Sequence, residues 1–94
     1  MEKRHNQSSW CVYVLLCRNN YLYIGMTNNL EKRMAAHEKG NGSKFVRSHR
    51  PFELSKKIYC KDEKEARKLE YTLKKLKRQD KFKELDLEYC AILK

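Results

Sequence analysis

The sequence has no hydrophobic segment long enough to cross a bilayer. Its longest apolar run, residues 10–17, has about eight residues, whereas a membrane-spanning helix needs about 20. The polar residues 1–9 also lack the apolar core of a signal peptide. These absences predict an intracellular protein, in the cytoplasm or in the nucleoid or nucleus, with no membrane partner.

The chain also lacks the cysteine spacing of a zinc site. It contains no internal repeat and no linker between domains. Its four cysteines include no C-x-x-C pair, and in an intracellular protein we expect them to be reduced thiols: Cys11, Cys17, Cys60 and Cys90. With 94 residues, one domain is the default. We predict a flexible N-terminus over 1–9, a folded domain over 10–82 and a C-terminal tail over 83–94 that packs on or near the domain. We expect a monomer or weak dimer.

Acidic residues are scarce beside basic ones. Asp and Glu together number 12, Lys and Arg number 22, and the formal net charge is +10. So large an excess on a small domain indicates a polyanionic partner. Nucleic acid is the first candidate and an anionic membrane surface the second. The alternative is that lysine-rich helices only keep the protein in solution.

The first half of the chain predicts a β-hairpin followed by a helix. Residues 10–17 are almost continuously apolar, as in a strand buried on both faces, and residues 21–26 form a second strand after a short polar turn. The helix has Asn28 as its expected N-cap and Glu31 as the partner in a capping box. It should end near Lys39, before Gly40.

The second half predicts a basic loop over 40–51, an edge strand over 52–59 and a long helix. Asp62 and Glu65 form a second capping box, and an apolar stripe follows: Ala66, Leu69, Leu73 and Leu76. Residues 82–93 are expected to pack back as a short helix or strand. The order β-β-α-β-α predicts an α+β fold with a small, mostly antiparallel three-stranded sheet flanked by helices.

Glu70 lies on or beside the apolar stripe of the last long helix. A carboxylate there is costly unless it is paired. Three explanations are open: a divalent cation, an arginine, or a position at the rim with Lys74, which follows four residues later.

Arg33 and His37 are four residues apart on one helix face, together with Leu30, so this face turns partly inward. The pair indicates an ion-pair network or a phosphate site, and a structural role for His37 is the simpler alternative. Tyr13 and Tyr23 lie on the two hairpin strands, where core packing is the ordinary role. A free phenol has a pKa near about 10, so tyrosine acts as a base only inside a cationic site.

Taken together and in order, these residues resemble the GIY-YIG nuclease family, most closely its small stand-alone members. Residues 10–15 look like the first signature, with Cys11 in place of glycine, and Tyr23, Ile24 and Gly25 form the second. The segments 27–37, 42–47, 50–54 and 66–74 resemble further family motifs, so the resemblance covers about residues 10–80.

The resemblance implies a metal-dependent endonuclease that acts on DNA. Glu70 would hold Mg²⁺ or Mn²⁺, Tyr23 or Tyr13 would accept the proton of the attacking water, and Arg33 would neutralise charge in the transition state. His37 would orient groups or relay a proton. The candidate nucleic-acid contacts are Lys44, Arg47, Arg50 and Lys74.

Two departures from the family pattern weaken the expectation of fast catalysis. Met26 stands where some relatives have lysine, and no asparagine follows the glutamate helix in residues 77–94. One alternative is therefore a nucleic-acid-binding module with the same fold and little or no cleavage. The other is a basic adaptor for an acidic protein surface.

Overall fold

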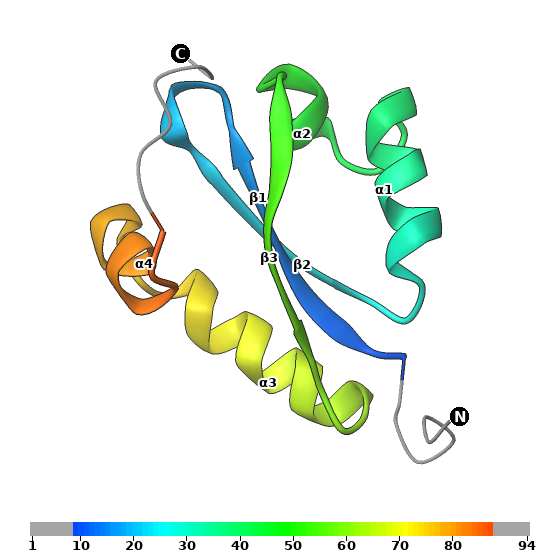
Figure 1. Cartoon of the computed structure of the whole chain (residues 1–94), viewed down its shortest axis with the longest axis vertical. Coiled ribbons are helices and arrows are strands. Elements are labelled where there is room, and N and C mark those ends of the chain that lie inside the picture. The colour runs from blue at the N-terminus through cyan, green and yellow to red at the C-terminus, as the bar shows by residue number, and fades with distance from the viewer. Residues whose placement is uncertain (1–8, 88–94) are drawn as a thin grey trace.

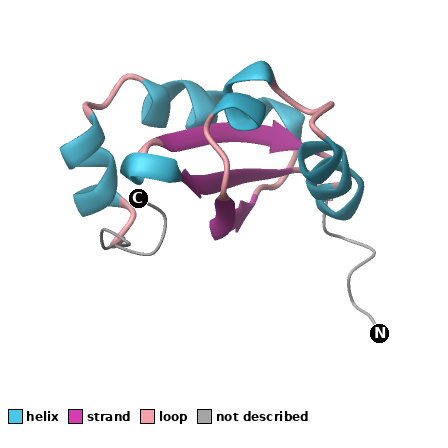
Figure 2. Cartoon of the chain, turned by 90° about the horizontal axis from the view of Figure 1, so that it is seen from above, coloured by secondary structure: helices cyan, strands magenta, loops and turns pink. Residues whose placement is uncertain are grey.

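The computed structural model describes residues 9–87, which form one three-stranded antiparallel sheet with helices on both faces (Figure 1). The strand order is β2-β1-β3. Seen from above, the strands lie between helical segments (Figure 2). Within residues 9–87, no helix has both the length and the hydrophobicity that a membrane span requires. The elements are β1 Cys11–Cys17, η2 Arg18–Asn20, β2 Leu22–Thr27, α1 Leu30–Lys39, α2 Lys44–Ser48, β3 Phe52–Tyr59, α3 Glu63–Lys74 and α4 Arg78–Glu84.

β1 is the central strand, and all seven of its residues are buried. This confirms the expectation of a strand covered on both faces, because β2 and β3 flank it and helices cover it above and below. The hairpin turn is a single 3₁₀ turn in which Asn19 and Asn20 adopt left-handed backbone angles, with φ of 62° and 61°. Asparagine tolerates this conformation better than most residues do. The predicted hairpin and three-stranded sheet are confirmed.

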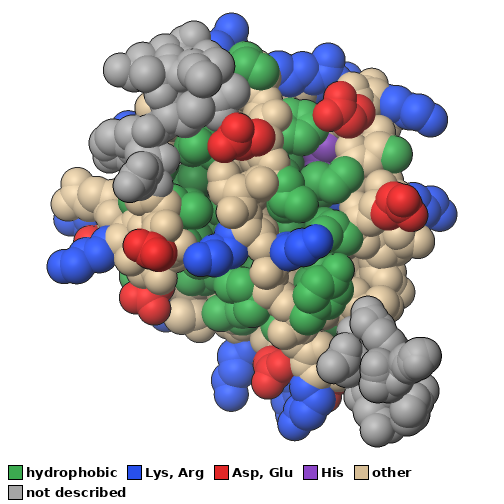
Figure 3. All heavy atoms as spheres, viewed as in Figure 1, with side chains coloured by type: hydrophobic (Ala, Val, Ile, Leu, Met, Phe, Trp, Pro, Cys, Tyr) green, Lys and Arg blue, Asp and Glu red, His purple; other side chains and the backbone are tan. Residues whose placement is uncertain are grey.

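β3 lies at an edge of the sheet, as its alternating pattern predicted. It pairs with β1 antiparallel, and the register shifts between Val14 and Leu15. Leu54 and Tyr59 on this strand are exposed. Figure 3 shows Lys and Arg side chains spread over the face that carries β3, with apolar side chains between them.

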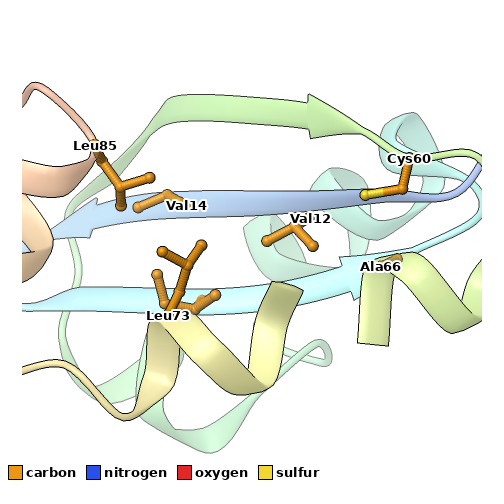
Figure 4. Close-up of a cluster of buried hydrophobic side chains, with 7 residues drawn as sticks. Val12, Val14, Cys60, Ala66, Leu73 and Leu85 are labelled. Carbon is orange, nitrogen blue, oxygen red and sulfur yellow. The ribbon is translucent and has the colours of Figure 1, made fainter. Parts of the chain in front are cut away.

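The two faces of β1 pack against different helices, because successive side chains of a strand point to opposite sides. Val12 and Val14 pack with Ala66 and Leu73 of α3, and Leu85 closes the same cluster (Figure 4). Tyr13, Leu15 and Cys17 face the other way, against Val46 of α2 and partly buried side chains of α1. Each face therefore has its own core, separated by the sheet.

The structure corrects three local expectations. The N-cap of α1 is Asn29, not Asn28, because its side chain accepts a hydrogen bond from Lys32 N at 3.0 Å. The expected loop over 40–51 contains the short helix α2, which begins at Lys44. Ser43 is its N-cap, and its hydroxyl accepts from the backbone nitrogens of Phe45 and Val46.

The long helix is also shorter than its apolar stripe. α3 ends at Lys74, so Leu76 lies beyond it, in the turn before α4. At the start of α3, Asp62 accepts from Glu65 N, as predicted, and Glu65 in turn accepts from the Lys61 nitrogen. Residues 1–8 of the expected N-terminal segment and residues 88–94 of the expected tail lie outside the described part of the chain.

Candidate active site

The two candidate tyrosines lie side by side on one face of the hairpin. Tyr13 is opposite Gly25 and Leu15 is opposite Tyr23, so Tyr13 and Tyr23 form a diagonal pair across neighbouring strands. Their ring centroids are 6.2 Å apart. Tyr13 is fully buried, whereas Tyr23 is only partly covered and is the one that solvent reaches.

Gly25 makes room for the Tyr13 ring. A Cβ atom at position 25 would lie 2.5 Å from both Cζ and Oη of Tyr13, which no side chain can tolerate without movement. The sequence pattern contains this glycine, but it does not say why a side chain is excluded. The reason is the register, which sets Gly25 directly opposite Tyr13.

His37 lies beneath the tyrosine pair, fully buried. Its Nε2 atom is 2.9 Å from the Tyr13 hydroxyl, and its ring meets the Tyr23 ring at a centroid distance of 5.5 Å. Gly42 packs on the other edge of the imidazole, where a Cβ would lie 2.5 Å from Nδ1. Nδ1 has no hydrogen-bond partner among the described residues. The sequence placed Gly42 only at the start of a family-like segment, and this packing role was not predicted.

Burial keeps both members of the Tyr13–His37 pair neutral. Burial raises the pKa of Tyr13 well above its ordinary value, and the neighbouring Tyr23 raises it further, while Arg33 opposes this shift. Burial also lowers the pKa of His37, and the Arg33 charge adds to that effect. At neutral pH the pair is therefore a phenol hydrogen-bonded to an uncharged imidazole.

Arg33 lies one turn before His37 on α1 and is half-buried. Its charge affects the pKa of both Tyr13 and His37, so the guanidinium lies within electrostatic reach of both rings. Within residues 9–87 its guanidinium makes no hydrogen bond or ion pair, whereas its backbone nitrogen donates to the Asn29 carbonyl oxygen. An arginine in that state keeps its planar donor set available to an anion such as a phosphate.

Glu70 approaches the same site from α3. Its negative charge is one cause of the raised Tyr13 pKa, so the carboxylate is also within electrostatic reach of that phenol. The side chain is 20% exposed and forms an ion pair with Lys74 Nζ at 3.3 Å. The pairing with Lys74, one of the three explanations that the sequence left open, is therefore present.

The described residues contain no cluster of three or more His, Cys, Asp or Glu side chains that could enclose a metal ion. A cation at Glu70 would have that carboxylate as its protein ligand and would take its remaining ligands from water and substrate. Mg²⁺ commonly binds through one or two carboxylates plus phosphate oxygens. The donor set thus fits a substrate-completed site rather than a closed protein cage.

The cations of the 44–50 segment make no described contact with the two tyrosines. Lys44 and Arg47 are exposed on α2. Arg50 donates from Nη2 to the carbonyl oxygens of Glu38 at 3.1 Å and His37 at 3.5 Å, which satisfies the C-terminal end of α1. Among the described contacts, none joins these three cations to the tyrosine pair.

α2 also contributes Phe45 to the surroundings of Tyr23. Its ring stacks on Tyr23 at 6.0 Å and on His49 at 4.1 Å. A small pocket of about 200 Å³ opens beside it. Six residues line this pocket: Leu22, Tyr23, Ile24, Phe45, Lys74 and Lys81.

Comparison with known proteins supports the family resemblance of these motifs. The GIY-YIG catalytic domain matches residues 9–84. A UPF0213 protein of Oceanobacillus iheyensis is 42% identical over 80 residues, covering 82% of this chain and 90% of the relative. A UPF0213 protein of Clostridium perfringens is 44% identical over 70 residues, covering 74% of this chain and 75% of the relative.

A solved structure has the same architecture. The solution NMR structure of a UPF0213 protein from Bacillus halodurans matches with a TM-score of 0.55 and 30% identity, over 88% of each chain. The family match spans the hairpin, α1 and α3, the elements that bring Tyr13, Tyr23, Arg33, His37 and Glu70 together. The chain therefore belongs to the GIY-YIG family of nuclease domains.

Proposed function

We propose that this protein is a divalent-metal-dependent endonuclease that hydrolyses DNA phosphodiester bonds. The observation that supports this most is the convergence of five side chains from four elements. Tyr13, Tyr23 and His37 are in contact, and the charges of Arg33 and Glu70 both act on the Tyr13 phenol. A base candidate, a cation for phosphate and a hard-ion ligand would thus share one site.

Glu70 would hold the metal ion, Mg²⁺ or Mn²⁺, because carboxylate oxygens suit hard cations. When bound, such an ion supplies Lewis acidity at a phosphate oxygen and at the leaving oxygen. The partial exposure of Glu70 leaves space for water and phosphate around the carboxylate. Lys74 would then shift from Glu70 to a phosphate of the substrate.

Tyr23 is the better candidate for the base, although the sequence left the choice between the tyrosines open. Tyr13 is buried, its hydroxyl is hydrogen-bonded to His37, and its pKa is raised. Tyr23 is partly exposed beside it and can meet an attacking water. Tyr13 and His37 would hold the Tyr23 ring in place, with His37 as a neutral acceptor behind it.

Arg33 would bind the scissile phosphate and neutralise the charge that develops in the transition state. Its half-buried position on α1 restricts its movement, and its lack of a described partner means that no internal ion pair must break first. Lys44, Arg47 and Arg50 remain candidate contacts to flanking phosphates at greater distance from the chemistry.

Nicking of supercoiled plasmid in Mg²⁺ or Mn²⁺ tests the proposal. The wild-type protein should nick, EDTA should abolish nicking, and Glu70→Gln should reduce it at least 100-fold, since about 2.7 kcal/mol of transition-state stabilisation corresponds to that factor. The matched control is Glu63→Gln. Glu63 forms a similar ion pair with Arg67, four residues later on α3, but takes no part in the tyrosine cluster. Equal cutting by wild type and Glu70→Gln would rule out the proposed role of Glu70.

The second candidate function is nucleic-acid binding without cleavage. It is favoured by the ion pair that occupies Glu70 and by the single carboxylate at the site. Salt-sensitive binding with no nicking in either metal would select it. Failure of plain DNA to bind near physiological salt would favour the third hypothesis, an adaptor for an acidic protein.

A further inference from the structure

We propose that Phe45, His49 and Tyr21 form a stacking platform for an unpaired base of the substrate, next to the pocket between α2 and α3. The inference deepens the proposed function and rests on it, because it assumes that a nucleic acid strand enters the tyrosine site. It names the substrate class: a strand with at least one nucleotide outside a duplex, either single-stranded or displaced from its helix.

The platform is an exposed aromatic cluster. Tyr21 is 42% exposed and Phe45 is 36% exposed, a large cost for side chains that could be buried elsewhere. Phe45 and His49 are nearly parallel, 4.1 Å apart with an interplanar angle of 13°. Tyr21 meets both of them edge-on, at 6.2 Å and 5.1 Å. The cluster thus presents partly exposed aromatic surface beside Tyr23, on which Phe45 also stacks.

The rings are held in place by other contacts. Ser43 caps the first turn of α2 at Phe45, and Val46 anchors that turn in the core. His49 Nδ1 is 2.7 Å from the Phe45 carbonyl oxygen. The Arg78 guanidinium lies 4.8 Å above the Tyr21 ring and donates to the Asn19 carbonyl oxygen at 3.1 Å. A platform positioned in advance loses little conformational entropy when a ligand stacks on it.

The neighbouring charges suit a nucleotide. Phe45 and Tyr23 line the pocket of about 200 Å³ from one side, and Lys74 and Lys81 line it too, with no acidic side chain among its lining residues. Aromatic faces beside ammonium groups match the two halves of a nucleotide, a flat base and a phosphate. Lys74 also pairs with Glu70, so the pocket adjoins the proposed metal ligand. The stacked base would belong to a nucleotide flanking the scissile phosphate.

An intact duplex cannot use this platform. Both faces of a paired base are covered by its neighbours in the helix, so a protein ring can stack only on a base that has left it. Duplex DNA would contact the phosphate-binding cations alone, whereas an unpaired strand would contact the cations and the rings.

Fluorescence anisotropy in EDTA tests the inference without cleavage, using a labelled single-stranded oligonucleotide and the blunt duplex of the same sequence. Phe45→Leu should weaken single-strand binding about tenfold, the usual loss when one base-stacking ring is removed. Duplex affinity and the salt dependence of both complexes should not change, because no phosphate contact is lost. Tyr21→Leu should act in the same direction. The control is Tyr59→Leu, which removes a ring that is 57% exposed on β3.

The outcomes separate this inference from the proposed function. Nicking by wild type combined with unchanged binding by Phe45→Leu would overturn the platform and leave the nuclease. An equal loss on both oligonucleotides would also overturn it, because a general packing defect affects both. A selective loss on the single strand, without any nicking, would support the platform and remove the nuclease. Absence of binding by the wild type to either oligonucleotide would remove both.

Discussion

The two faces of the sheet are built from different chemistry. The α3 face is aliphatic: Val12, Val14, Ala66 and Leu73 pack with no hydrogen bond required between their side chains. The opposite face places a tyrosine hydroxyl against a buried histidine and two glycines against aromatic rings. The same strand, β1, supplies both. The first face needs only apolar volume, whereas the second depends on particular atoms at particular distances.

This difference separates stability from function within one small chain. An aliphatic face tolerates exchange among similar side chains, because its contribution scales with buried area. A face with buried polar groups tolerates such exchanges poorly, because each buried polar group left without a hydrogen-bond partner costs free energy. Substitutions in the aliphatic cluster should therefore change mainly stability, whereas those on the α1 and α2 face should change both the site and the stability.

The largest expected effect on stability is at Leu73. The side chain is buried against β1, so Leu73→Ala should lower the free energy of unfolding by about 3 kcal/mol through lost burial and a cavity. Urea denaturation measures this loss. Leu69→Ala, on the same helix but only partly buried, should cost clearly less. Equal costs would mean that the depth of burial against β1 does not set the contribution of these leucines.

The next largest effect is expected at Gly25, where a substitution tests the close packing of the other face. Gly25→Ala should cost about 2 kcal/mol, because the new methyl group must displace the buried Tyr13 ring. In a Tyr13→Leu background the same substitution should cost less than half as much, and a double-mutant cycle by urea denaturation measures that coupling. Additive costs in the cycle would show that the Tyr13 ring is not what excludes a side chain at position 25.

Much of this fold could be predicted from local sequence signals. The hairpin, the edge strand and the cap at Asp62 follow from hydrophobic alternation, turn residues and capping chemistry, which act over a few residues. α2 was missed because five residues are too few to show helical periodicity, although Ser43 is the kind of residue that caps a helix.

The site was harder to predict, for a physical reason. Helical spacing places Arg33 beside His37, but no local rule brings Glu70 to the tyrosines or His37 to the Tyr13 hydroxyl. These proximities depend on how α1 and α3 pack on the sheet, and only the family resemblance linked the residues to one site. The excluded volume at Gly25 is likewise a property of the strand register.

A smaller effect should appear in the pH dependence of stability. The pKa of His37 is lowered in the folded protein from 6.5, by burial and by Arg33, so the unfolded chain binds the proton more readily. The stability that His37 contributes is fully present above pH 6.5 and is lost as the pH falls toward the folded-state pKa. Below pH 6.5 this single group adds a slope of at most about 1.4 kcal/mol per pH unit.

His37→Gln should remove that slope while leaving the titration of the carboxylates in place. Chemical denaturation at a series of pH values between about 5 and 7.5, the range in which histidine titrates, measures the difference between variant and wild type. His49→Gln is the matched control, because His49 is only half-buried. Parallel pH profiles for His37→Gln and wild type would contradict the neutral buried imidazole.

The smallest effect is at the start of α1, the helix that carries Arg33 and His37. Asn29→Ala should cost about 1 kcal/mol, because the Lys32 backbone nitrogen loses its capping oxygen. Asn28→Ala should cost a few tenths at most, since Asn28 is exposed and the cap is at the next position. Urea denaturation of the two variants compares neighbouring asparagines of equal size. A larger loss at Asn28 would return the cap to the position that the sequence first indicated. The expected order would show that the side-chain bond at Asn29 sets the beginning of the helix on the functional face.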